Sequence, residues 1–248
     1  MKRKERHHLK ENDLAQSIKK AREAIESRRR QITTGAFVIV VIALVFGAFS
    51  LWQGRNDARA EQLLGQAMTA LNARVVPATA AGAAPGELPE AATFGAVGSY
   101  STEAAKLTAA LPKLKAAADA FPDTEAGITA RYHYAATLSS LGRHQEAVQE
   151  FDNVVSRAGS DSLYGRMSRL GKADTQMQAN QLDAAIATWK ELASSSDEEL
   201  PKDAILMELA KAYAAKGNQE EARKTFTKII DEHPTSPYSA EARAELGS

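Results

Sequence analysis

The sequence contains no cysteine. Disulfide bonds, thiolate catalysis, cysteine-based zinc sites and lipid attachment through a cysteine are therefore excluded. The chain also lacks the G-x-S-x-G, H-E-x-x-H and G-x-G-x-x-G motifs of common enzymes. The segment GRMSRLGK at residues 165–172 is similar to a phosphate-binding loop. It has one residue too many between its glycines, however, and alanine follows where magnesium needs a hydroxyl. We therefore expect no enzymatic activity, no cofactor and no metal.

A net charge is absent as well, because 31 Lys and Arg balance 31 Asp and Glu. This sum hides an asymmetry. Residues 1–54 carry 11 basic and 5 acidic side chains, whereas residues 55–248 carry 20 basic and 26 acidic ones. All the basic residues of the first part lie before an apolar segment. Such a split indicates two compartments or a membrane surface, and we expect no nucleic-acid partner.

Charged residues are missing altogether from Gln31 to Gly54. Twelve of the residues from Ile32 to Leu51 are Leu, Ile, Val or Phe. As a helix, this segment would reach about 36 Å, which exceeds a bilayer core of about 30 Å. Trp52 stands at its far edge, where an indole prefers the membrane interface. We therefore predict a transmembrane helix over residues 31–54. A cleaved signal peptide fits less well, because its apolar region is shorter.

Lysine and arginine are concentrated in residues 1–30, just before the predicted span. The positive-inside rule predicts that this basic segment is cytoplasmic and that residues 55–248 lie outside the cytoplasm. In a bacterium, the chain would be a single-pass protein of the inner membrane with a periplasmic domain. A cytosol-facing repeat receptor is the alternative, and its span would have to insert against the charge bias.

Two segments of different composition follow the predicted span. Residues 55–76 read as a membrane-proximal helix, because Leu63, Leu64, Ala67 and Leu71 recur at three- and four-residue steps. Residues 77–100 are rich in alanine, proline and glycine and have little apolar periodicity. We interpret them as a linker that separates this helix from a C-terminal domain at residues 101–248.

The C-terminal domain contains an internal repeat, in which a small residue precedes an aromatic residue by four positions. The pattern occurs at Ala147 and Phe151, Ala185 and Trp189, and Ala222 and Phe226, with a weaker copy at Ala110. The alanines are 37 or 38 residues apart. A small residue lets two helices approach closely, and an aromatic residue one turn later fills the gap to the next pair. We predict an all-α chain, with a transmembrane helix followed by an α-solenoid of helix hairpins.

These repeats, with Pro122 and Pro234 near their ends, resemble tetratricopeptide repeats. The resemblance covers about residues 101–248 and implies a scaffold for protein–protein interactions. The middle repeat departs from the family pattern, since Arg169, Lys172 and Gln176 fall on core positions. The layout of the whole chain is similar to that of bacterial inner-membrane proteins with a periplasmic repeat domain. That group includes the ancillary subunit of the Sec translocon, so the resemblance implies translocon or chaperone partners.

The inner face of such a stack is built by the first helix of each repeat. The repeat register places six residues on this predicted groove: Tyr132, Ser139, Met167, Leu170, Met207 and Lys211. Methionine adapts to varied apolar partners, so we expect the groove to bind segments of client or partner proteins. Because few charges line it, binding should depend weakly on salt. The groove lacks the Lys, Arg and Asn pattern of a carboxylate clamp.

A second class of function stays open, that of a structural tether or a self-associating envelope protein. Small residues form a loose stripe on the predicted span at Ala36, Ala43, Gly47, Ser50 and Gly54. Such residues let transmembrane helices pack closely, so a homo-oligomer is a further expectation.

Overall fold

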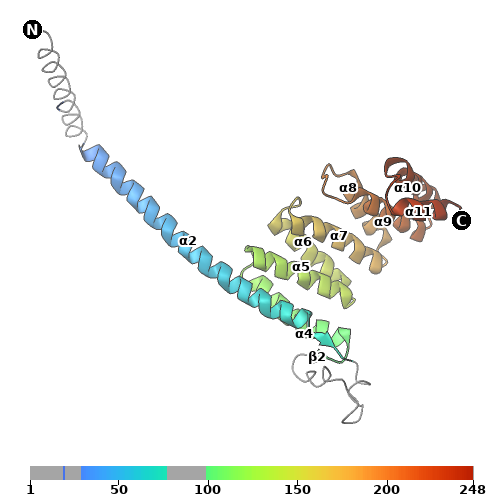
Figure 1. Cartoon of the computed structure of the whole chain (residues 1–248), viewed down its shortest axis with the longest axis horizontal. Coiled ribbons are helices and arrows are strands. Elements are labelled where there is room, and N and C mark those ends of the chain that lie inside the picture. The colour runs from blue at the N-terminus through green and yellow to red at the C-terminus, as the bar shows by residue number, and fades with distance from the viewer. Residues whose placement is uncertain (1–18, 20–28, 77–98, 248) are drawn as a thin grey trace, which may run out of the picture. The chain divides into compact units, whose positions relative to one another are not determined.

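The computed structural model describes residues 19, 29–76 and 99–247. Most of the basic segment 1–30 and nearly all of the predicted linker 77–100 lie outside these residues. The chain divides into two compact units, residues 1–55 and 56–248. Over the residues just named, Figure 1 shows helices and two short strands, which agrees with the fold class predicted from the sequence.

Helix α2 (Arg29–Leu71) contains the apolar segment. Among the described residues, one helix is long and apolar enough to cross a membrane, and it covers Phe37–Leu71. The mean hydropathy of its most apolar window is 2.2, and none of that window is buried. Nearly all of the large exposed apolar side chains among the described residues lie between Phe37 and Trp52. In water this surface would be unfavourable, whereas a bilayer would cover it.

The second unit begins at Asn56, although the sequence placed the domain boundary near residue 101. The end of α2 packs in this unit, where Ala60, Ala67 and Ala70 are buried. Two short strands lie between α2 and α4. Strand β1 (Arg74–Val75) pairs in parallel with β2 (Ser99–Tyr100). The predicted helix over residues 55–76 therefore ends at residue 71, and the segment after it pairs with residues on the far side of the linker.

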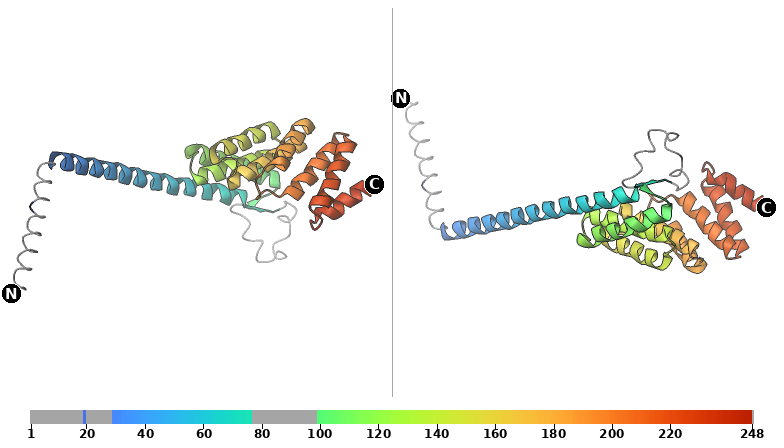
Figure 2. Two further views of the ribbon diagram at one scale, coloured as in Figure 1. Left: turned by 90° about the horizontal axis from the view of Figure 1, so that it is seen from above. Right: turned by 90° about the horizontal axis from the view of Figure 1, so that it is seen from below.

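The remaining helices follow one another as antiparallel neighbours, and each packs against the next (Figure 2). Their bounds are α4 (Glu103–Ala120), α5 (Glu125–Ser140), α6 (His144–Ala158), α7 (Leu163–Gln178), α8 (Leu182–Ser194), α9 (Lys202–Ala215), α10 (Gln219–Glu232) and α11 (Tyr238–Gly247). The pairs α5/α6, α7/α8 and α9/α10 are the three predicted hairpins. The copy at Ala110 lies on α4, and the end of α2 occupies the place of its partner helix.

The turn inside each hairpin has the same backbone conformation. Gly142, Asn180 and Gly217 occupy equivalent positions and have φ values of 75°, 56° and 84°. After each of them, the next backbone N–H donates to a carbonyl five residues earlier, as from Arg143 to Leu138 at 2.9 Å. This is the Schellman pattern, in which a left-handed residue ends the helix. Asparagine tolerates this conformation better than most residues, so the middle repeat turns without glycine.

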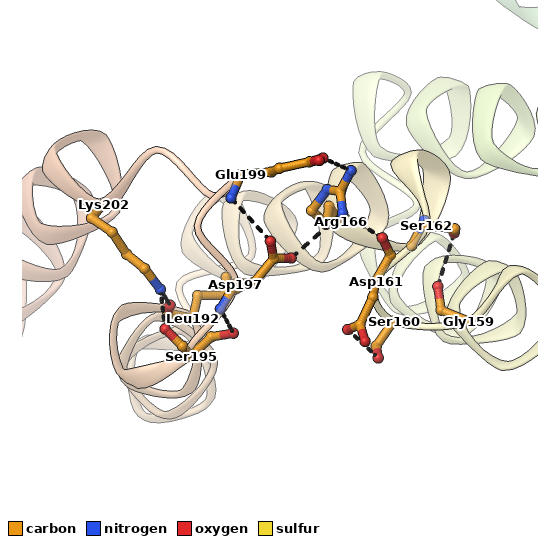
Figure 3. A network of polar contacts seen from close by, with 11 residues as sticks. Gly159, Ser160, Asp161, Ser162, Arg166, Leu192, Ser195, Asp197, Glu199 and Lys202 are labelled. Carbon is orange, nitrogen blue, oxygen red and sulfur yellow. Dashed lines mark hydrogen bonds and ion pairs between the residues drawn. The ribbon is translucent and has the colours of Figure 1, made fainter.

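Two of the turns between hairpins are tied together. Figure 3 shows Arg166 at the start of α7, where its guanidinium donates to the carbonyl of Asp161 and pairs with Glu199. Its Nη1 also lies 3.7 Å from Asp197. Lys202 donates to the carbonyls of Leu192 at 2.9 Å and Ser195 at 2.5 Å. The bonds of Arg166 join the turn before α7 to the turn before α9, whereas those of Lys202 fix the turn before α9 to the end of α8.

The repeat residues form the core of the second unit. All seven positions of the small-and-aromatic pattern are buried, with exposed fractions of 4% or less: Ala110, Ala147, Phe151, Ala185, Trp189, Ala222 and Phe226. One core cluster joins α2, α4, α5 and α6, and another joins α7 to α11. Each hairpin thus buries its apolar face against its neighbours, as stacked repeats require.

The middle repeat accommodates its polar residues without a shift of the helix. Gln176 is buried and its Oε1 accepts a hydrogen bond of 2.8 Å from Thr188 on α8. Arg169 and Lys172 reach outward to Glu191 at 3.2 Å and Asp152 at 2.7 Å. Leu170 and Met177 pack partly buried against the core. A buried amide with a partner costs little, so this departure from the repeat pattern is compatible with the fold.

Candidate interaction face

The first helices of the three hairpins, α5, α7 and α9, carry the residues predicted to bind partners. Tyr132, Met167, Leu170 and Lys211 are partly exposed. The side chain of Ser139 is 9% exposed, and its hydroxyl lies 2.9 Å from the Thr175 hydroxyl on α7. It therefore joins α5 to α7, and its polar atom is already occupied.

Met207 is fully buried, with 0% of its surface exposed. The prediction that it lines a binding surface is wrong for this structure. Much of helix α9 is buried, since Ile205, Leu206 and Leu209 are buried as well. Along the middle of α9, only Glu208 and Lys211 are partly exposed. The last helix, α11, packs against both α9 and α10, so α9 has a further neighbour.

Aromatic rings gather where α5 meets the start of α7. The ring of Tyr132 lies 5.6 Å from that of Tyr164 and 6.0 Å from that of Phe151. On its own helix, Tyr132 meets the ring of His133 edge-on at 5.3 Å. These distances suit favourable aromatic contacts. Burial raises the pKa of Tyr132 and lowers that of His133, so both side chains are neutral at neutral pH. Sequence reasoning missed Tyr164, which lies one turn before Met167.

A carboxylate stands beside this aromatic group. The charge of Asp174 on α7 acts on Tyr132, which helps to raise the tyrosine pKa. The pKa of Asp174 itself is raised to about 6, first by the protein atoms that surround it and second by the Glu208 carboxylate on α9. Its side chain is nevertheless partly open to solvent.

Charged residues pair on α9 and between α9 and α11. Lys211 lies 3.3 Å from Glu208 and 3.1 Å from Glu241. We use the name α5/α7/α9 face for Tyr132, Tyr164, Asp174, Glu208 and Lys211. Its two carboxylates exceed its one ammonium group. The expectation that few charges line the predicted groove stays a prediction.

This arrangement offers side chains that can contact another molecule. Within the described parts of the chain, no group of three or more His, Cys, Asp or Glu side chains could hold a metal ion. Asp174 has a raised pKa, but no hydroxyl or other nucleophile forms a hydrogen bond with it among the residues described. The aromatic rings and carboxylates can instead contact apolar and cationic groups of another molecule.

A comparison with protein families finds tetratricopeptide-like repeats in this chain. Residues 124–243 match a family model described as a tetratricopeptide repeat-like domain. No curated protein matches the chain significantly. A crystal structure of nearly identical TPR-like repeats from Podosopora anserina is 19% identical, covering 57% of this chain and 76% of that one with a TM-score of 0.47. MamA from Desulfovibrio magneticus RS-1 is 20% identical, covering 57% and 73% with a TM-score of 0.45.

The family match begins at Thr124, the residue before α5, and ends within α11. It therefore includes the three hairpins and the α5/α7/α9 face, and it excludes α2 and α4. Tetratricopeptide-like repeats generally mediate protein–protein interactions and are not typically enzymes. The match and the observed helix hairpins together support a tetratricopeptide-repeat family for this domain.

Proposed function

We propose that this chain is a membrane-anchored scaffold that binds other proteins through its α5/α7/α9 face. The observation that carries the binding role is the set of side chains on that face. The hydroxyl groups of Tyr132 and Tyr164 and the carboxylate of Asp174 have no hydrogen-bond partner among the described residues. Partly exposed aromatic side chains with free hydroxyl groups can give another protein both apolar and hydrogen-bonding contacts.

Helix α2 would provide the membrane anchor. Large apolar side chains such as Phe37, Phe46 and Leu51 are between 69% and 72% exposed, and this is unfavourable in water. We propose that residues 32–52 cross the bacterial inner membrane. The excess of Lys and Arg before the span favours a periplasmic position for residues 55–248.

The partner would be another envelope protein or a client protein. The layout of the chain resembles that of the ancillary subunit of the Sec translocon, and this resemblance favours partners at the translocon or among chaperones. Exposed anionic and aromatic groups on the face favour a segment that has both cationic and apolar side chains.

The topology can be tested with reporters at both ends. A reporter active only in the periplasm should work when fused after Ser248, and a cytoplasmic reporter should be silent there. The same pair fused after Arg30 should give the opposite result. If the reporter after Ser248 is active only in the cytoplasm, the proposed location is wrong.

The binding role can be tested by purification from solubilised membranes. Replacement of Tyr132 by alanine should remove the proteins that co-purify with the chain, because it removes the centre of the aromatic group. Asn153 is exposed on α6, so Asn153→Ala provides the matched control and should retain them. Thermal unfolding of both variants shows whether the fold persists. A folded Tyr132→Ala variant that keeps every partner would contradict the proposal.

A further inference from the structure

Helix α7 has two different sides. Leu170 and Met177 lie two turns apart and Ala173 lies between them, so the three share one side of the helix. They pack in the core cluster that joins α7 to α11. Ala173 is the one buried apolar side chain of α7, a helix that the structure describes in full. The apolar side of α7 thus belongs to the C-terminal core.

A second side of α7 contacts α5 and α6 through small and polar residues. The Thr175 hydroxyl lies 2.9 Å from the Ser139 hydroxyl on α5, and both residues are buried. One turn earlier, Gly171 lies against Phe151 on α6, because a Cβ there would be 2.7 Å from Cζ of the ring. These contacts bury little apolar surface of α7, since Ala173 alone among its apolar side chains is buried and lies on the other side.

A buried hydroxyl on this second side has no partner. Ser168 lies one turn before Gly171 and is 0% exposed, and its Oγ has no hydrogen-bond partner among the described residues. Keeping such a group dry costs free energy, which water would return if the helices separated. Lys172 and Asp152 form an ion pair of 2.7 Å across the same boundary. Both side chains are partly exposed, so water can replace this contact as well.

The next boundary between hairpins is apolar by contrast. Leu192, Leu200 and Ile205 lie at the passage from α8 to α9 and are at most 3% exposed. They belong to the cluster that joins α7 to α11, whereas Phe151 on α6 belongs to the cluster that joins α2, α4, α5 and α6. Within the described parts of the chain, no core cluster contains buried residues of both α6 and α7. Because apolar burial holds helices together, the boundary between α6 and α7 is the weaker one.

We propose that this boundary is a joint that opens transiently while the helices on both sides stay folded. We use the name polar joint for Ser168, Gly171 and Thr175 on α7 with Ser139 on α5 and Phe151 on α6. Opening separates α4 to α6, with the end of α2, from α7 to α11. Local openings of this kind occur where few apolar contacts must be broken.

Opening of the polar joint changes the α5/α7/α9 face. Tyr132 on α5 and Tyr164 on α7 lie on opposite sides of the joint, with their rings 5.6 Å apart. The distance between the rings increases when the joint opens, so the face admits partner segments of different size. This use in binding rests on the proposed function, whereas the joint itself does not.

Single cysteines test the joint, because the chain has none of its own. Ser168→Cys nearly keeps the size of the side chain and places a thiol inside the joint. Ala173 is equally buried on the apolar side of the same helix, so Ala173→Cys is the matched control. A thiol-reactive fluorophore is added to the full-length chain in a neutral detergent. Ser168→Cys should react at least about tenfold faster than Ala173→Cys, because opening of the joint exposes only the first thiol.

Urea distinguishes opening of the joint from unfolding. Opening exposes little surface, so the labelling rate of Ser168→Cys should rise only slightly with urea. The rate of Ala173→Cys should rise steeply, because its thiol is reached only through a larger unfolding. Thermal unfolding of both variants checks that the fold persists. Equal rates with equal urea dependence would overturn the proposal.

An apolar joint should open less often. Ser139→Ala together with Thr175→Val removes both hydroxyl groups of the buried pair, so neither is left without its partner. In the Ser168→Cys chain, these two changes should slow labelling about threefold or more, since apolar contact replaces a hydrogen bond that water can supply. Unchanged or faster labelling would show that the polar contacts do not cause the opening, and it would contradict the proposal.

The outcomes separate this inference from the proposed function. If Ser168→Cys and Ala173→Cys react alike while Tyr132→Ala removes the partners in membranes, the joint is wrong and the binding role stands. If Ser168→Cys reacts faster but Tyr132→Ala keeps every partner, the joint stands and the binding role is wrong.

Discussion

Gly171 allows α6 and α7 to pack closely, and its replacement by alanine tests the position of these helices. A Cβ atom at Gly171 would lie 2.7 Å from Cζ and 2.9 Å from Cε1 of Phe151. Carbon atoms prefer separations of about 3.5–4.0 Å, so the ring would have to move. Phe151 is only 2% exposed and is held by its neighbours, including Tyr132. The added methyl group therefore overpacks the core.

Two opposing terms set the size of the effect. Overpacking costs about 1–3 kcal/mol, whereas alanine in place of glycine in a helix interior gains about 1 kcal/mol. Gly65 provides the control for the second term. It is exposed on the part of α2 that belongs to the second unit, and a Cβ there would meet nothing within 4 Å. The difference in unfolding free energy between Gly171→Ala and Gly65→Ala should thus be about 1–3 kcal/mol.

Thermal unfolding followed by circular dichroism measures this difference. Gly65→Ala should raise the midpoint, and Gly171→Ala should lie several degrees below it, since 1 kcal/mol shifts a domain of this size by about 2–4 °C. Phe151→Leu replaces the ring by a smaller side chain. It should cost less stability in the Gly171→Ala variant than in the wild type, because it removes the clash between the ring and the new methyl group. If Gly171→Ala is as stable as Gly65→Ala, the packing of α6 on α7 described here is wrong.

Three further changes have defined outcomes. Arg131 is 7% exposed and pairs at 2.7 Å with both Asp119 and Glu150, so Arg131→Met should cost about 1–3 kcal/mol in urea unfolding because both partners are partly solvated. The raised pKa of Asp174 means that its stabilising contribution is present below pH 3.8 and lost as the pH rises through about 6. The wild type should therefore gain stability over Asp174→Asn between pH 7 and 5, by less than about 1 kcal/mol because the group is exposed. A fragment of residues 56–248 should unfold cooperatively. A fragment of residues 77–248 should not, because the loss of residues 56–76 exposes the core next to α4.

The sequence predicted the features that depend on local pattern. The small-and-aromatic pairs predicted which residues form the core, since their spacing repeats along each second helix. The apolar helix was evident from composition alone. Asn180 takes the position that glycine holds in the other repeats, and its left-handed backbone conformation matches that of Gly142 and Gly217. Each of these features is decided within a single hairpin or a single helix.

The features that sequence reasoning missed depend on neighbours from elsewhere in the chain. Met207 occupies a groove position in the repeat register, but α9 also packs against α11, and this helix is not part of the pattern. The contribution of α2 to the second unit was hidden by the long segment before α4. Repeat periodicity alone does not show such proximity.

The central claim is that the α5/α7/α9 face meets other proteins at the membrane, and site-specific photo-crosslinking in intact cells tests it most directly. A photoreactive phenylalanine at position 132 replaces one aromatic side chain by another, and the same group at position 153 serves as the control on α6. We predict discrete crosslinked products with proteins of the envelope from position 132 and none of these from position 153. Identical products from both positions, or products only from position 153, would contradict the account.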